Sequence, residues 1–287
     1  MGFKERLGRV GVWSMELRFG DGAEAVAAAA ELEELGFGAI WIPGGIGGDI
    51  FGDVSRLLGA TRKVVIGTGI INIWKHEPAE LATWWKALPA GHQERALLGL
   101  GVSHGPLIGE TYGKPLAVMR EFLDKLSALG VPASSLCLAA LGPKMLELAR
   151  DRTAGAHPYL VTPAHSAEAR RIMGPAALLA PEQGAVLESD PVRARQLARQ
   201  ALEHYRQLPN YLNNWRRLGY SDKDIAELSD NVVDALFAWG DGGKVAERVD
   251  AHIAAGADHV CLQVINEGGM SVSAARDGWR KLAKAVL

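Results

Sequence analysis

The sequence is poor in the features that mark several large classes of protein. It contains two cysteines in 287 residues, Cys137 and Cys261. Each lies in an apolar run, so we expect buried, reduced thiols and no secreted disulfide framework. The 31 basic and 33 acidic residues nearly cancel, which gives no support for a nucleic-acid or anionic-membrane partner. No segment supplies the ~20 apolar residues of a membrane span. The stretch MGFKERLGRV lacks the apolar region of a signal peptide, and we expect a cytoplasmic protein.

Motifs for several kinds of catalysis are also missing. HExxH is absent, and no His/Asp/Glu cluster has metal-ligand spacing, so we expect no metal site. No predicted strand ends in a carboxylate pair or a lysine, which argues against glycosidase and Schiff-base chemistry. The predicted strand ends instead hold Gly, Trp, Asn, Thr and His. Such a lining suits a large planar cofactor, because backbone can approach its faces at glycines.

Short apolar runs alternate with helical patterns along the chain. Most runs are continuously apolar, which is typical of parallel strands buried on both faces. A helical pattern that ends at Gly36 and another that begins at Pro78 show the repeated unit of strand, loop and helix. Eight such units predict an α/β protein, a (β/α)8 TIM barrel formed by one domain over residues 1–287. The runs span residues 9–14, 38–43, 63–70, 95–101, 135–141, 157–162, 176–181 and 259–265.

One region holds more helix than a barrel unit needs. Residues 190–240 contain several helical patterns in a row, between the seventh and eighth predicted strands. The clearest begins with Asp190 as the expected N-cap and Pro191 behind it. We expect a helical insertion that is a lid, a subunit contact or plain decoration of the barrel.

The third predicted strand ends in an unusual way. In VVIGTGIINIWKHEP, residues 64–78, Gly67 and Gly69 interrupt an apolar run. Functional sites of TIM barrels lie at the carboxyl ends of the strands. Glycines at this place indicate that the backbone bends or lies close to another group.

Two further strand ends carry histidine. GLGVSHGP places His104 just past the fourth strand, and its single GxG is weak evidence for a phosphate loop. HPYLVTPAHS places Thr162 and His165 near the start of a helix. These two residues could contact a phosphate there or simply cap the helix.

The ordered set of motifs resembles the bacterial-luciferase-like superfamily of flavin- and deazaflavin-dependent oxidoreductases, and is most similar to its actinobacterial coenzyme F420-dependent branch. The resemblance runs along nearly the whole chain. It rests on LGRVGVWS, IWIPGG, VVIGTGIINIWKHEPAELA, LLGLGVSHGPLIGETYGKPLAVMREFLDKL, AALGPKMLELA, GAHPYLVTP, LAPEQGAVLESD, YLNNWRRLGY and AAGADHVCLQV.

The resemblance implies hydride transfer to or from a deazaflavin held at the top of the barrel. It implies a cis peptide at Gly69-Ile70 that backs the deazaflavin ring, and His104 in the position of a family acid/base residue. It also implies a substrate pocket shaped by Trp13 and Trp74, for a small-molecule substrate. The cofactor-binding residues that it implies are Gly69, Ile70, Asn72, Ser103, His104, Ala140, Leu141, Gly142, Thr162 and His165.

One departure from the family pattern leaves the function open. Some F420-dependent dehydrogenases carry an Asp-His pair after the second strand, where this sequence has Pro43 and Gly44. The dehydrogenase mechanism that uses that histidine therefore does not transfer. Two alternatives stay beside the F420-dependent oxidoreductase: an FMN-dependent monooxygenase of the same fold, and a non-catalytic binding protein. On resemblance we expect a homodimer.

Overall fold

The computed structural model describes residues 2–45, 47–267 and 269–287. Its strands pair in parallel throughout the described part of the chain. They are β1 (Val10–Trp13), β2 (Ala39–Ile42), β3 (Val65–Thr68), β4 (Ile71–Asn72), β5 (Ala96–Gly101), β6 (Leu136–Leu138), β7 (Gly155–Ala156), β8 (Leu178–Leu179), β9 (Glu182–Val186), β10 (Phe237–Trp239) and β11 (Val260–Val264).

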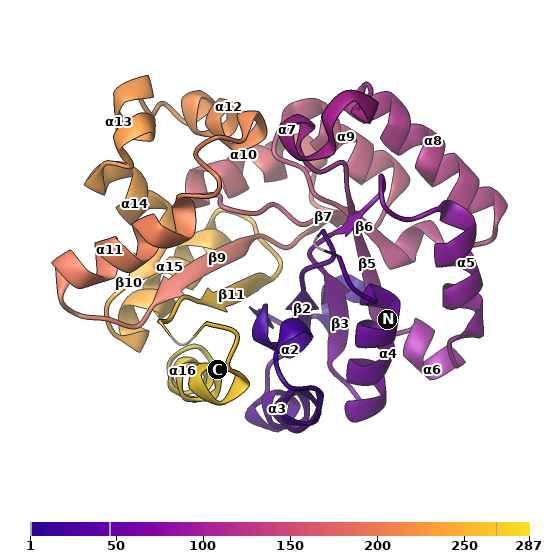
Figure 1. Cartoon of the computed structure of the whole chain (residues 1–287), viewed down its shortest axis with the longest axis horizontal. Coiled ribbons are helices and arrows are strands. Elements are labelled where there is room, and N and C mark those ends of the chain that lie inside the picture. Colours follow the sequence, from indigo (N-terminus) through magenta and orange to yellow (C-terminus); the bar gives the residue numbers. More distant parts are fainter. Residues whose placement is uncertain (1, 46, 268) are drawn as a thin grey trace.

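Helices surround this sheet, as Figure 1 shows. In the first half of the chain they are α1 (Phe3–Arg6), α2 (Glu16–Phe19), α3 (Gly22–Leu35), α4 (Ile50–Ala60), α5 (Pro78–Ala87), α6 (Ala90–Gln93), α7 (Gly105–Ile108) and α8 (Pro115–Ala128). In the second half they are α9 (Pro143–Arg152), α10 (Pro163–Met173), α11 (Pro191–Leu202), α12 (Pro209–Arg217), α13 (Asp222–Glu227), α14 (Asp230–Leu236), α15 (Gly242–Ala254) and α16 (Val272–Val286). Among the described residues, no helix combines the length and the apolar character that crossing a bilayer requires.

The predicted TIM barrel is confirmed. The sheet runs β9-β11-β1-β2-β3-β5-β6-β7-β8. Only Ala180 and Pro181 separate β8 from β9 along the chain, so the first and last members of that order are one interrupted strand and the sheet closes on itself. Strand alternation divides the core in two. Ile40 and Ile42 pack outward with the helices, whereas Trp41 packs inside the barrel with Val65.

Several helix ends lie where the sequence places them. Helix α3 ends before Gly36, which has a φ of 100° and so takes the left-handed conformation that glycine tolerates best. Helix α5 begins at Pro78, and the Asp190 side chain accepts a hydrogen bond from the backbone N–H of Arg193 at the start of α11. Both cysteines are buried and free, as expected.

Two predictions of secondary structure were wrong in detail. The sixth strand, β7, ends at Ala156, because Pro158 has no N–H to continue a ladder; the run 157–162 is therefore irregular. Residues 190–240 hold α11 to α14 but also β10, which pairs beside β9 through Phe237 and Gly184. The run NVVDALFAWG, one of the helical patterns expected in this region, is thus a helix and then a strand. In Figure 1, α11 to α14 gather on one side of the molecule, in orange.

Candidate active site

A cavity of about 780 Å³ lies at the carboxyl ends of the strands. Pockets of ~300–1,000 Å³ are typical of small-molecule and cofactor sites. Residues that follow β1, β3, β5, β6 and β7 line it on the barrel side, and residues of 201–217 line it on the insertion side. Of the predicted site residues, the cavity brings together Trp13, Gly69, Ile70, Ser103, His104, Ala140, Leu141 and Gly142.

The segment between β3 and β4, which forms part of the cavity wall, is a β-bulge. Gly67 pairs with Leu97, and Ile71 pairs with Leu100. The three residues 68–70 therefore face the two residues 98–99, which leaves one extra residue in the β3 side. The Gly69-Ile70 peptide in this bulge is cis, as the resemblance implied.

Glycines of neighbouring segments make room for the bulge. A methyl group at position 44 would lie 2.7 Å from the Ile70 carbonyl oxygen, and one at position 99 would lie 2.0 Å from the Thr68 carbonyl oxygen. A methyl group at position 101 would lie 2.4 Å from the Ile70 side chain. The glycines of GLGVSHGP therefore serve close packing around Ile70. This packing role explains the glycines of GLGVSHGP better than a phosphate loop does.

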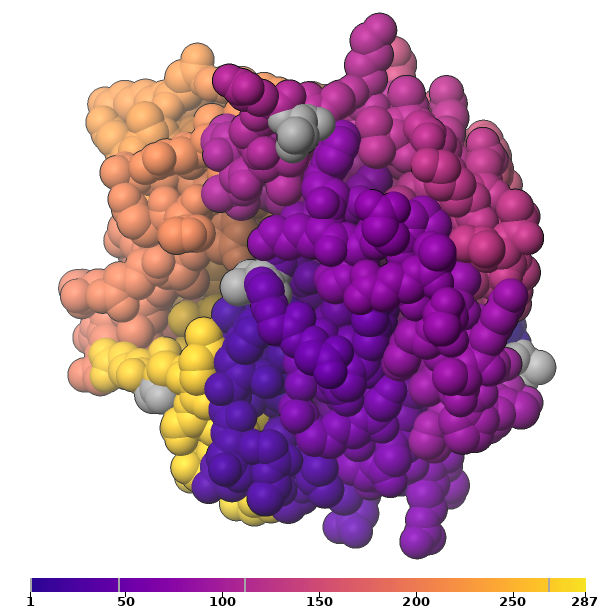
Figure 2. All heavy atoms as spheres, turned by 45° about the vertical axis from the view of Figure 1, so that its right-hand side comes forward, coloured from indigo at the N-terminus to yellow at the C-terminus, as the bar shows by residue number. Residues whose placement is uncertain are grey.

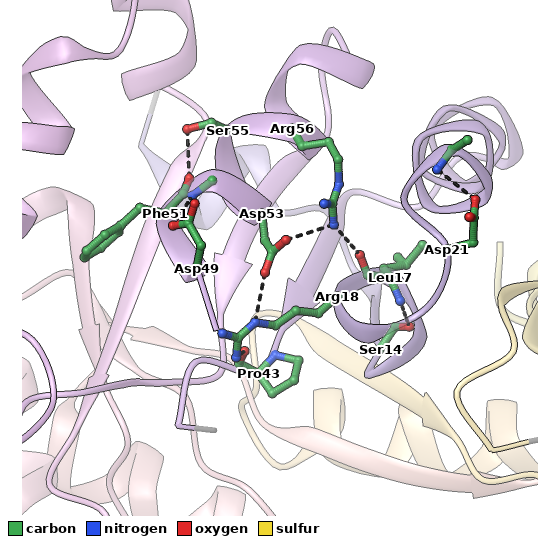
Figure 3. A network of polar contacts seen from close by, with 12 residues as sticks. Ser14, Leu17, Arg18, Asp21, Pro43, Asp49, Phe51, Asp53, Ser55 and Arg56 are labelled. Atoms are coloured by element: carbon green, nitrogen blue, oxygen red, sulfur yellow. Dashed lines mark hydrogen bonds and ion pairs between the residues drawn. The ribbon is translucent and has the colours of Figure 1, made fainter. Parts of the chain in front are cut away.

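The loop after β2 is held against the bulge by a buried arginine, shown in Figure 3. The Arg18 side chain, which is 1% exposed, donates to the carbonyl oxygens of Pro43 and Gly47 and forms an ion pair with Asp53. Arg56 contacts the other oxygen of Asp53 at 3.0 Å. Helix α2 and helix α4 thus fix the loop that supplies Pro43 and Gly45 to the cavity wall.

His104 lies at the start of α7 and lines the cavity. Burial lowers the pKa of its imidazole to about 4, so the ring is neutral at neutral pH. Its Nδ1 atom is buried and has no hydrogen-bond partner among the described residues. The His104 ring lies 5.1 Å from the ring of Tyr211. A neutral imidazole beside a cavity can accept or relay a proton.

Tyrosines from two parts of the chain form an aromatic wall. Tyr159 follows β7, while Tyr205 and Tyr211 belong to the insertion, and all three line the cavity. The Tyr159 hydroxyl donates to Gln263 Oε1 at 2.8 Å and lies 3.2 Å from the Tyr205 hydroxyl. Burial raises the pKa of each of these phenols, so they are neutral hydrogen-bonding groups. The insertion therefore completes the site.

The insertion also meets the barrel at the mouth of the cavity. Asn210 Nδ2 donates to the Ser103 carbonyl oxygen at 3.2 Å. In Figure 2 the orange insertion accordingly lies beside the purple-magenta segment that follows β5. Arg217 donates to the Leu141 carbonyl oxygen at 2.7 Å, next to the start of α9 at Gly142. A cation and the positive end of the α9 dipole at one edge favour an anionic part of a ligand.

Four predicted site residues lie outside the cavity lining. Asn72 is buried, and its side-chain oxygen accepts from the backbone N–H of Trp74. The Trp74 indole donates to the Val102 carbonyl oxygen at 2.8 Å. Thr162 caps α10, and His165 contacts the Leu141 carbonyl oxygen at 3.0 Å. These residues support the backbone of the cavity wall from behind.

Sequence reasoning missed several residues of the site. His157 lines the cavity, although the apolar run predicts it at the start of a strand. Pro158 is the signal that argues against a strand over residues 157–162, because proline has no N–H for a ladder. No local pattern marks Tyr205, Tyr211 or Arg217, because these residues reach the cavity only when the insertion packs on the barrel. Over the described ranges, no group of three or more His, Cys, Asp or Glu side chains could hold a metal ion.

Comparison with known proteins agrees with this geometry. The profile described as luciferase-like monooxygenase matches residues 7–259. The chain belongs to the luciferase-like monooxygenase family, a family of oxidoreductases. A Mycobacterium tuberculosis protein assigned by name to the coenzyme F420-dependent oxidoreductases is 35% identical over 109 residues. That match covers 36% of this chain and 30% of the relative, so the chain spans about a third of the relative's length.

Solved structures of other proteins share the fold along nearly the whole chain. An F420-dependent secondary alcohol dehydrogenase in complex with an F420-acetone adduct aligns with a TM-score of 0.72 and 17% identity, over 98% of this chain and 99% of that one. The oxygenating constituent of 3,6-diketocamphane monooxygenase from Pseudomonas putida, in complex with FMN, aligns with a TM-score of 0.69 and 14% identity, over 98% of each chain. The neighbours thus include both F420 and FMN proteins.

Proposed function

We propose that the protein is a coenzyme F420-dependent oxidoreductase that transfers a hydride between the deazaflavin and a small organic substrate. The observation that carries the proposal is the cavity wall formed by the Ile70 bulge, which is fitted between Gly44, Gly99 and Gly101. Such a wall of backbone suits the face of a planar ring. When bound, the deazaflavin supplies a centre that accepts or donates a hydride.

Residues of this chain fit the cofactor along the cavity. The bulge at Gly69 and Ile70 would back its ring, and the backbone of Ala140 to Gly142 would lie along its tail. Arg217 and the start of α9 would attract the negative charge of that tail. Support for F420 over FMN comes from the relative whose name assigns it to the F420-dependent oxidoreductases.

In this proposal His104 holds or takes up the proton that accompanies hydride transfer. Burial keeps the imidazole neutral at neutral pH, so one ring nitrogen carries a lone pair that can accept a proton. We expect a His104→Gln variant to bind cofactor as the wild type does and to lose turnover by ~10²-fold or more. The matched control is His92→Gln on α6, which lies outside the cavity lining. A His104→Gln variant with wild-type turnover would remove this role.

The cofactor is tested by titrating the apoprotein with F420 and, separately, with FMN, and following fluorescence. We expect saturable binding of F420 and weak binding of FMN. Tight FMN binding without F420 binding would overturn the proposal. It would favour the second candidate, an FMN-dependent monooxygenase, which the family description and the FMN-bound structural neighbour support. Oxygen consumption with reduced FMN and a candidate substrate then distinguishes that activity.

The third candidate, a non-catalytic binding protein, has less support. It predicts a barrel mouth filled by side chains. The cavity of about 780 Å³ bordered by Gly69 and His104 counts against it.

A further inference from the structure

A row of aromatic rings borders the cavity. The ring centroid of Tyr211 lies 5.1 Å from that of His104 and 6.3 Å from that of Tyr159. The Trp13 ring continues the row, 5.4 Å from Tyr159. Tyr205 packs against Tyr159 at 5.6 Å and against Tyr211 at 5.2 Å. All five residues line the cavity, and we call them the aromatic arc. Aromatic pairs favour separations of ~4.5–7 Å, so the arc is a continuous surface whose rings support one another.

The arc joins the insertion to the barrel around the cavity. Three of its members lie at or after the ends of β1, β5 and β7, while Tyr205 and Tyr211 belong to the insertion. The bulge at Gly69 and Ile70 lies on the barrel side of the same cavity. If the bulge backs the cofactor ring, the arc borders the space in which a substrate meets that ring.

The tyrosines of the arc present ring carbon more than hydroxyl to a ligand. The Tyr159 hydroxyl donates its proton to Gln263 Oε1 at 2.8 Å, so its hydrogen bond to the Tyr205 hydroxyl at 3.2 Å takes the proton from Tyr205. Both hydroxyl protons are thus used inside the protein, although both side chains remain partly exposed. A flat ligand gains from such a surface by burying its faces and by stacking.

Permanent charge is scarce in the cavity lining. Among the lining residues that the structure describes, Arg217 is the one lysine, arginine, aspartate or glutamate. Its guanidinium donates to the Leu141 carbonyl oxygen and to Asn214 Oδ1, both at 2.7 Å, beside the start of α9. The proposed function gives that edge to the cofactor tail. A cationic substrate would meet no carboxylate along the described lining, and burying an unpaired charge costs far more than burying a neutral group.

We propose that the substrate is a neutral compound built on a flat ring, aromatic or conjugated, which lies against the aromatic arc. The ring surface of the tyrosines selects a flat body over a flexible chain, and the scarcity of charge selects a neutral one. His104, at one end of the arc, places the proton acceptor of the proposed function beside such a ring. The inference rests on that function in assigning the cavity to a substrate.

The test compares four alcohols by saturation-transfer NMR on the whole apoprotein. Benzyl alcohol is a neutral ring and pentanol is a neutral chain of similar hydrophobicity. The para-carboxylate and para-trimethylammonium derivatives of benzyl alcohol carry a negative and a positive charge. We expect the Kd of benzyl alcohol to be about three- to tenfold lower than that of pentanol, as one aromatic contact predicts. Both charged derivatives should bind at least about tenfold more weakly than benzyl alcohol.

Variants at Tyr205 show whether the arc makes this choice. Tyr205→Leu should remove the preference for the ring, whereas Tyr205→Phe should retain it because the ring stays. The matched control is Tyr220→Leu, which changes a tyrosine of the insertion outside the described cavity lining and should leave all four affinities as they are. Tyr205→Leu should also leave the Kd of F420 unchanged, because the bulge and residues 140–142 are proposed to hold the cofactor.

Equal binding of benzyl alcohol and pentanol would overturn the flat ring, and tightest binding of either charged derivative would overturn the neutral substrate. A Tyr205→Leu variant that loses affinity for F420 would assign the arc to the cofactor and overturn the substrate proposal. The comparison of the four probes in wild-type protein stands even if a variant fails to fold. The separate F420 titration distinguishes the two proposals. A ring preference without F420 binding removes the cofactor assignment and keeps the substrate class, whereas F420 binding without a ring preference does the reverse.

Discussion

At the scale of single residues, the site depends on what is missing from three positions. Gly44, Gly99 and Gly101 each lack a side chain where one would meet the segment from Thr68 to Ile70. Gly99 and Gly101 lie on the adjacent strand β5, and Gly44 lies in the loop after β2. The bulge is therefore packed by backbone from two directions, and a β-carbon at any of the three positions would clash with it.

The pair Gly44 and Gly45 provides a matched test of this packing. A methyl group at position 44 would lie within 3.0 Å of three backbone atoms of Ile70 and Ile71, while one at position 45 meets its nearest atom at 3.9 Å. We expect Gly44→Ala to lower the free energy of unfolding by about 1–3 kcal/mol and to weaken cofactor binding. Gly45→Ala should change stability by less than ~1 kcal/mol. Urea unfolding and cofactor titration measure both, and equal effects of the two changes would contradict the packing argument.

At the scale of elements, a buried arginine fixes the loop between β2 and α4. Arg18 on α2 bonds two carbonyl oxygens of this loop as well as Asp53 on α4. Its side chain is 1% exposed, whereas that of Arg56, which also pairs with Asp53, is 33% exposed. A buried ion pair that loses one partner leaves an uncompensated charge, while an exposed pair contributes little.

We therefore expect Arg18→Met to lower the free energy of unfolding by about 3 kcal/mol and Arg56→Met by less than ~1 kcal/mol. Because the loop supplies Pro43 and Gly45 to the cavity, Arg18→Met should also raise the Kd of the cofactor, and Arg56→Met should leave it unchanged. Urea denaturation and fluorescence titration of the two variants provide the comparison. If the Arg56 variant loses as much stability and affinity as the Arg18 variant, the loop is not held through Arg18.

Helix ends that depend on neighbouring residues could be predicted from the sequence. The cap at Asp190, the start of α5 at Pro78 and the left-handed Gly36 each depend on one or two neighbouring residues. Strand β10 was missed because Phe237 and Trp239 continue an apolar pattern that also suits a helix. The contact of Arg18 with Asp53 joins residues 35 positions apart, and that of His157 with Trp41 joins the residue after β7 to strand β2. No local pattern reports such contacts.

At the scale of the whole molecule, buried ionisable groups link stability to pH. Burial lowers the pKa of His104, His157 and His259 to about 4 and that of His252 to about 3. Between the unfolded pKa of about 6.5 and these values, the unfolded chain binds protons that the folded chain does not. The free energy of unfolding should therefore fall as the pH falls from 6.5 toward 4.

Glu182 acts in the opposite direction. It lies on β9, its Oε2 accepts from the Leu160 N–H at 3.1 Å, and burial raises its pKa to about 8. Between pH 4.5 and 8 the folded chain keeps a proton that the unfolded chain releases, so stability from this group is lost as the pH rises. The unfolded histidines still bind protons at pH 6.5 and outweigh it there, so the two effects balance at about pH 7, where the stability maximum lies.

Urea unfolding of the wild type from pH 4.5 to 8 should accordingly show a steep loss on the acid side of that maximum and a small loss on the alkaline side. One group contributes at most about 1.4 kcal/mol per pH unit, so Glu182 alone removes about 1.5–2 kcal/mol between pH 6.5 and 8, and the histidines return most of that amount over the same range. Glu182→Gln, which preserves an acceptor for Leu160, should abolish the alkaline loss and leave the acid loss intact. Glu34→Gln, on the exposed side of α3, should leave both unchanged. An alkaline limb that survives in Glu182→Gln would show that another group, and not this buried carboxyl, limits stability on the alkaline side of the maximum.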